Sequence, residues 1–159
     1  MDYRKFYGLH SEPFSNAPMN RFYFHSKQHS ESMVRLRHTL EHMKGLAVLE
    51  GEIGAGKTTL ARRMLEKLPD SEYEAALLVI IHAGITAEWL LKRIAIQLGV
   101  EHPSNDKLVI LRQLYQRLVE IYDQGRKTVV LVDEAQMLES RQILEEFRGL
   151  MNLEVPERK

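Results

Sequence analysis

The sequence has no cysteine, no excess of either charge and no long apolar run, and each absence excludes a class of protein. Without cysteine the chain cannot form disulfides or thiolate metal sites, which fits a reducing compartment. Lys plus Arg number 22 and Asp plus Glu also number 22, so the chain lacks the positive field of a dedicated nucleic-acid binder. The N-terminus, MDYRKFYGLH, has no apolar core like that of a secretory signal, and no run is long enough to span a bilayer. We therefore expect a cytoplasmic protein without a membrane segment, for which DNA is an unlikely partner.

The sequence does have the composition of a single globular domain, with 159 residues, 44% hydrophobic and 28% charged. Three short runs are apolar at successive rather than alternate positions: LAVLEG (46–51), AALLVIIHA (75–83) and TVVLVDEA (128–135). This pattern is typical of strands that are buried on both faces of a parallel sheet.

Amphipathic patterns around these runs predict helices over 26–43, 58–68, 86–99, 104–125 and 140–153. Thr86 is the expected N-cap of the third helix, and Gly99 its expected C-terminal glycine. The fourth helix should present one apolar face, formed by Leu108, Leu111, Tyr115, Leu118 and Tyr122. Strands that alternate with helices predict a layered α/β domain with right-handed crossovers.

The stretch GEIGAGKT (51–58) matches the phosphate-loop pattern G-x-x-x-x-G-K-[ST], with an apolar run before it and a helical pattern after it. Glycines allow successive backbone N–H groups to surround phosphate oxygens, and the helix N-terminus adds partial positive charge. Lys57 would reach the outer phosphates, and the Thr58 hydroxyl would hold Mg²⁺. The candidate nucleotide-binding residues are Gly51, Glu52, Ile53, Gly54, Ala55, Gly56, Lys57, Thr58 and Thr59.

Two adjacent carboxylates, Asp133 and Glu134, follow the third apolar run, at the sheet edge where parallel α/β proteins bind ligands. Asp133 is the candidate second metal ligand after Thr58, and Glu134 the candidate base that polarises an attacking water. A solvated acidic pair is the simpler alternative. The phosphate-loop pattern upstream in the same α/β chain favours the nucleotide site.

Together, GEIGAGKTT and VVLVDEAQML resemble the additional-strand (ASCE) P-loop NTPases, specifically the AAA+ ATPases, whose fold is a three-layer sandwich with a mainly parallel sheet. The flanking stretches FYGLHSEPFSNAPMNRFYFHSKQHSESMVRL, TAEWLLKRIAIQLG and EEFRGLMNLE look like the ATPase domain of the general secretion pathway protein A (ExeA-type) family. The resemblance covers nearly the whole chain. Residues 1–159 are thus interpreted as one partial AAA+ domain, in which 1–26 form an irregular aromatic arm.

The resemblance implies ATP and Mg²⁺ as ligands, with Lys57 and Glu134 as catalytic residues and Asp133 as the Walker B metal carboxylate. His82 ends the second apolar run, where AAA+ proteins often place a polar switch residue that holds the catalytic carboxylate inactive; a solvent-facing strand end is the alternative. The family also implies a homo-oligomer in the full-length form, secretion-machinery partners and, for a longer parent protein, a place at the inner face of the inner membrane.

The resemblance further implies a strand with a sensor residue and an arginine finger, which the sequence does not reach before it ends at NLEVPERK. In the family that strand lies between the strand before the phosphate loop and the strand that ends in Asp133. We therefore expect a fold that is incomplete at its C-terminus, with a gap in the sheet. Such a chain should be poorly stable alone, or fill the gap by pairing its own strands or borrowing one from another copy.

Three other functions share these motifs: a nucleotide-dependent DNA-binding regulator of the transposition type, a small-molecule kinase, and a fragment that binds nucleotide without hydrolysing it. The balanced charge argues against the first. The arm around Pro13, Phe14 and Phe22 is a candidate wall for the base, and the sequence does not distinguish adenine from guanine. His25 and His29 have a spacing that fits a metal on a helix, but no third ligand lies nearby, so we favour surface or adenine-pocket packing.

Overall fold

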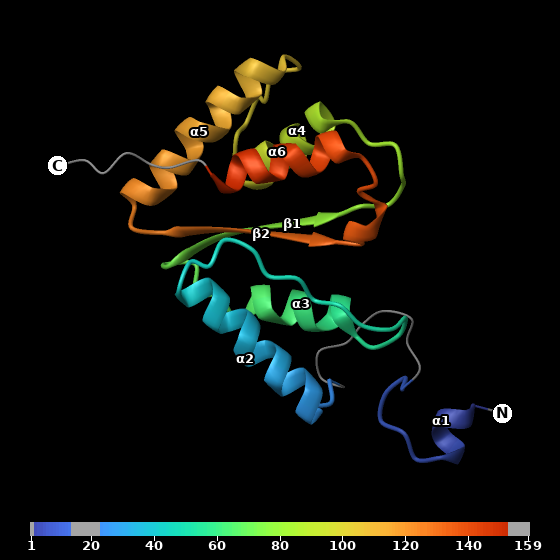
Figure 1. Cartoon of the computed structure of the whole chain (residues 1–159). Helices are drawn as coiled ribbons and strands as arrows, with labels where there is room; N and C mark the ends of the chain where they lie inside the picture. Colours follow the sequence, from blue (N-terminus) through green and yellow to red (C-terminus); the bar gives the residue numbers. More distant parts are fainter. Residues whose placement is uncertain (1, 14–22, 153–159) are drawn as a thin grey trace.

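The computed structural model describes residues 2–13 and 23–152, and its helices and strands follow one another in an α/β order (Figure 1). In chain order the elements are α1 (Tyr3–Phe6), α2 (Lys27–Glu41), α3 (Lys57–Glu66), β1 (Tyr73–Val79), α4 (Ala87–Gln97), α5 (Lys107–Asp123), β2 (Lys127–Asp133), the 3₁₀ turn η2 (Ala135–Met137) and α6 (Arg141–Met151).

The centre of the molecule is a parallel pair of strands, β1 and β2, with Tyr73 opposite Lys127 and Val79 opposite Asp133. Helices α4, α5 and α6 lie on one face of this sheet, and α2 and α3 lie on the other (Figure 1). The predicted α/β fold with a parallel sheet is confirmed. Because the strands are parallel, their carboxyl ends lie at one edge, which positions Asp133 next to the residues that follow β1.

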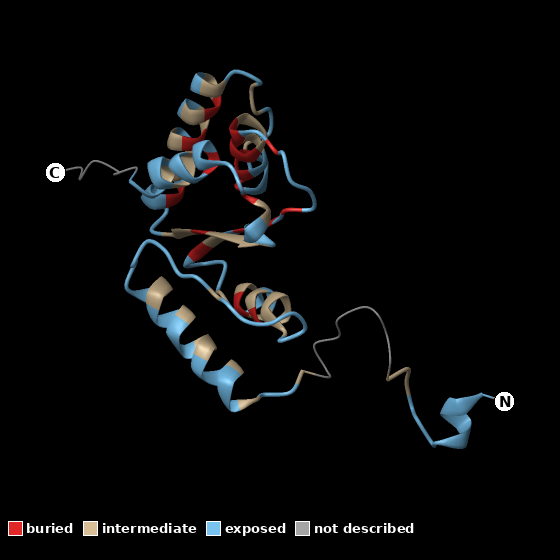
Figure 2. Ribbon diagram, turned by 45° about the vertical axis from the view of Figure 1, so that its right-hand side comes forward, coloured by how far each residue is buried: buried red, intermediate tan, exposed pale blue. Residues whose placement is uncertain are grey.

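The hydrophobic core lies mainly between the sheet and α4, α5 and α6, where most of the fully buried side chains gather (Figure 2). Helix α4 contributes residues at helical spacing: Ala87, Leu90, Leu91, Ile94 and Ala95. Both ends of α4 lie where the sequence predicts them. The Thr86 side chain accepts a hydrogen bond from the Trp89 N–H, and Gly99, at φ 89°, follows the C-cap in the left-handed region.

The predicted apolar face of α5 is correct only in part: Leu111 and Leu118 pack against the core while partly exposed, and the two ends of the predicted face are wrong. Leu108 and Tyr122 are 75% and 56% exposed, whereas Ile110, Leu114 and Ile121 are fully buried. Two apolar stripes run side by side along this helix, and its packing against α4 and β2 selects the second. The helix also begins later than the predicted 104, at Lys107, and Asp106 caps it by accepting a hydrogen bond from the Val109 N–H.

The predicted strand over 46–51 is also wrong. Residues 46–50 have no strand assignment, and within the described residues β2 pairs with β1 alone. An apolar run becomes a strand only when a neighbouring backbone completes its hydrogen bonds, and no such neighbour lies beside this segment in the described part of the chain. Leu46 and Val48 are accordingly 64% and 70% exposed.

The described residues before α2, 2–13 and 23–26, are irregular apart from the single turn of α1. Helix α2 begins at the Ser26 cap, close to the predicted start. Every residue of α2 is exposed or only partly buried, so this helix packs lightly on α3. Phe14 and Phe22, the candidate walls of a base, and Leu153 at the end of the predicted last helix lie outside the described residues. Among the described residues, no helix combines the length and apolar character needed to cross a bilayer.

Candidate nucleotide site

The loop before α3 has the backbone of an anion cradle. Gly54 and Gly56 have φ values of 81° and 79°, in the left-handed region that glycine enters without steric cost. Gly56 is also the N-cap of α3, where the described residues provide no side-chain cap. The first N–H groups of α3 therefore have no partner within their own helix, and they carry the positive end of its dipole.

Lys57, the first residue of α3, folds back over this loop. Its Nζ donates hydrogen bonds to the carbonyl oxygens of Gly51 at 2.8 Å and Glu52 at 2.9 Å. The ammonium group is thus held beside the loop by two neutral acceptors. A phosphate oxygen would be a stronger acceptor for it, because charge-assisted hydrogen bonds are about twice as strong as neutral ones.

Thr58 and Asp133 meet at the site from two adjacent layers of the fold, helix α3 and the sheet. The Thr58 hydroxyl on α3 donates to Asp133 Oδ1 at the end of β2 at 3.0 Å, and the same oxygen accepts from the Glu134 N–H at 3.1 Å. This contact joins the two predicted motifs, which are 75 residues apart in the chain.

The same two side chains fit a magnesium ion. Both offer oxygen ligands, and two neighbouring ligands of an octahedral ion at ~2.1 Å lie about 3.0 Å apart. One carboxylate and one hydroxyl are also the usual protein share of a magnesium site that nucleotide phosphates complete. Thr58 and Asp133 are therefore the residues that could hold Mg²⁺.

Glu134, the candidate base, lies next to this pair on the exposed turn after β2. Its φ of 57° is left-handed, which is uncommon for a residue with a Cβ. The Gln136 Nε2 donates a hydrogen bond to its carboxylate. His82 follows β1 on the same edge, and its Nδ1 donates to the Ala83 carbonyl at 3.0 Å. Sequence reasoning missed Gln136, although a polar side chain two residues after Glu134 was visible.

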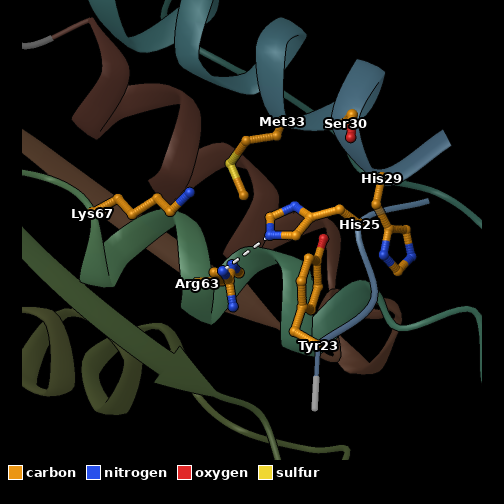
Figure 3. Close-up of a pocket in the computed structure, with 7 residues that line it drawn as sticks. All are labelled: Tyr23, His25, His29, Ser30, Met33, Arg63 and Lys67. Atoms are coloured by element: carbon orange, nitrogen blue, oxygen red, sulfur yellow. Dashed lines mark hydrogen bonds between the residues drawn. The ribbon is translucent and has the colours of Figure 1, made fainter. Parts of the chain in front are cut away.

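A shallow pocket of about 180 Å³ lies between the start of α2 and α3 (Figure 3). It is lined by Tyr23, His25, His29, Ser30, Met33, Arg63 and Lys67. Arg63 lies over the Tyr23 ring at 4.2 Å and donates to His25 Nε2 at 3.3 Å. His25 and His29, for which the sequence favoured packing at the surface or in a base pocket, both line this pocket. The contribution of Arg63 and Lys67 could not be predicted, because they lie on the other side of the phosphate loop in the sequence.

Comparison with known proteins agrees with this geometry. Residues 38–159 match a family described as AAA domain. Over 158 residues the chain is 35% identical to a protein named general secretion pathway protein A from Aeromonas hydrophila, and the match covers 99% of this chain. The chain spans 28% of the length of that relative. No solved structure matches it.

Proposed function

The chain belongs to the AAA domain family of P-loop NTPases, and on that premise we propose that it binds Mg-ATP between the loop 51–59 and the Asp133–Glu134 pair and hydrolyses the terminal phosphate. The observation that carries the proposal is the 3.0 Å contact between Thr58 and Asp133, because it brings the phosphate loop and the carboxylates to one point.

Each residue has a role that follows from its position. The N–H groups of the loop and of the first turn of α3 would bind phosphate oxygens, and Lys57 would neutralise charge on the outer phosphates. Thr58 and Asp133 would hold Mg²⁺, which supplies further positive charge when bound. Glu134, exposed at the turn after β2, would align the water that attacks the terminal phosphorus in line.

The biological setting is proposed from the relative alone. The name of that relative links the relative to general secretion. We therefore propose that this chain is the ATPase part of a secretion-type assembly, that its partners are secretion-machinery proteins, and that its full-length form is a homo-oligomer. We place it in the cytoplasm, which the lack of cysteine supports. A DNA-dependent function is the weaker alternative, because the 22 basic residues of the chain are balanced by 22 acidic ones.

The test is calorimetric titration of ATP into the folded chain with and without Mg²⁺. We expect the chain to bind ATP more tightly when Mg²⁺ is present, and Lys57→Ala to abolish this binding. Lys44→Ala, at an exposed lysine outside the loop, is the control and should bind ATP as the native chain does. Glu134→Gln should still bind ATP, but its rate of ATP hydrolysis should fall at least about a hundredfold, the usual effect of losing a general base. The control Glu139→Gln should hydrolyse ATP at the native rate. A folded native chain that binds no ATP would refute the proposal.

A further inference from the structure

A hydrogen bond through an imidazole ring joins helix α2 to the phosphate loop. His29, in the first turn of α2, has its Nε2 at 2.8 Å from the Ala55 carbonyl oxygen, 26 residues later in the chain. A carbonyl only accepts hydrogen bonds, so Nε2 carries the proton and donates. This is a long-range bond to the crest of the loop.

The ring is fixed in place from several sides. Its backbone N–H donates to the Ser26 side chain, which caps α2 at 3.2 Å, and the ring stacks on Tyr23 at 5.6 Å between centroids. A Cβ built on Gly56 would lie 3.0 Å from His29 Cε1, so the ring occupies the space beside that glycine. Figure 3 shows His29 at the rim of the pocket, at the N-terminal end of α2.

Packing alone does not account for this histidine. Its Nδ1 is buried and has no hydrogen-bond partner among the described residues. A buried polar atom without a partner opposes folding, and an apolar ring of similar size would avoid that cost. The bond to Ala55 is what distinguishes histidine from such a ring at this position.

The orientation of one peptide explains what the bond does. In a trans peptide the carbonyl of Ala55 and the N–H of Gly56 point in opposite directions. Holding the carbonyl outward at His29 therefore directs the Gly56 N–H toward the other side, the concave side where phosphates would bind. This peptide rotates about ψ of Ala55 and φ of Gly56, and glycine adopts a wide range of φ values without steric cost. A fixed Ala55 carbonyl therefore excludes the flipped peptide orientation, in which the Gly56 N–H would point away from the phosphates.

We propose that His29 is a positioning residue that pre-orients the Ala55–Gly56 peptide of the phosphate loop for a nucleotide di- or triphosphate. The inference rests on the proposed function and adds to it a residue outside both nucleotide motifs. Because the loop is ordered before the ligand arrives, His29 lowers the cost of binding phosphate.

The first experiment compares ADP and ATP affinities of three variants by calorimetry. His29→Phe keeps the ring and its stacking but loses the donor, His29→Gln restores a donor on a side chain of similar reach, and His38→Phe is the matched control. His38 is on the same helix, is exposed and stacks on His42. We expect His29→Phe to weaken both nucleotides about fivefold to tenfold with little change in Tm, His29→Gln to recover most of the affinity, and His38→Phe to match the native chain.

The second experiment needs no nucleotide, and therefore separates this proposal from the proposed function. In the native chain we expect the Gly56 amide to give one sharp NMR resonance, and in His29→Phe a resonance that is shifted and broadened by exchange between peptide orientations. An unchanged Gly56 resonance with native ADP affinity would overturn the proposal. So would a loss of affinity that follows a loss of Tm and that His29→Gln does not recover, since that indicates a structural role.

Discussion

The Glu134 side chain is held by its own backbone conformation and by one neighbouring side chain. Its left-handed backbone turns the residue away from the strand direction, and Gln136 then donates to its carboxylate from two residues along the chain. His82, to which the family resemblance assigns the switch role, donates to its own neighbour Ala83. Among the described residues, a glutamine amide rather than the His82 ring is therefore hydrogen-bonded to the Glu134 carboxylate.

This arrangement predicts that the two polar neighbours act on the rate of hydrolysis rather than on nucleotide binding. We expect Gln136→Ala to change turnover about twofold to tenfold, the range of one exposed hydrogen bond, and to leave the Kd for ATP within about twofold. His82→Ala, as a switch, should also change turnover more than affinity. Steady-state hydrolysis and calorimetry give the two quantities, with Gln142→Ala on the exposed face of α6 as control. Equal losses of rate and affinity in either variant would count against its role.

At the scale of helices and strands, the sequence predicted the features that depend on local signals. A cap such as Thr86 and a terminal glycine such as Gly99 act within one turn, so the ends of α4 could be predicted. The meeting of Thr58 with Asp133 followed from the rule that ligand sites lie at the carboxyl ends of parallel strands. The strand at 46–51, the buried face of α5 and the role of His29 depend on partners distant in sequence, and a local pattern does not specify which partner is present.

One ion cluster joins β1, α5 and the turn between α5 and β2, and it predicts an effect on stability. Glu74 on β1 accepts from Arg126 at 2.7 Å and lies 3.6 Å from Arg117 on α5, and these side chains are only 21–23% exposed. Removing the carboxylate by Glu74→Ala leaves the shielded Arg126 guanidinium without a carboxylate partner among the described residues and leaves Arg117 with the exposed Glu120 alone, so we expect the free energy of unfolding to fall by about 1–3 kcal/mol.

Glu120 provides the matched control, because it pairs with the same Arg117 at 3.0 Å but is 61% exposed. Glu120→Ala should cost less than about 1 kcal/mol, since exposed ion pairs contribute little. Urea unfolding followed by circular dichroism measures both variants. Similar losses in the two would show that burial of Glu74 does not determine the strength of the cluster.

For the whole molecule, the two sides of the sheet are packed unequally. The side of α4, α5 and α6 holds most of the buried residues, whereas α2 and α3 contribute Leu60 and Met64 from α3 alone (Figure 2). Leu46 and Val48 remain exposed, and the sheet has two strands in the described part of the chain. Unpaired strand edges beside exposed apolar residues favour association between chains.

We therefore expect this chain, studied alone, either to melt below about 45 °C, the lower end for small domains, or to associate as its concentration rises. Calorimetry and analytical ultracentrifugation over a range of concentrations measure the two outcomes. Val48→Lys, which places a charge on the exposed apolar segment, should reduce association without lowering Tm, because it replaces exposed apolar surface with a charge. Val34→Lys, at a valine on α2 that is 67% exposed, should have no such effect. A monodisperse monomer with a high, cooperative melting transition would show instead that the exposed segment and the strand edge are no liability, and that the lightly packed side of the sheet is stable as it stands.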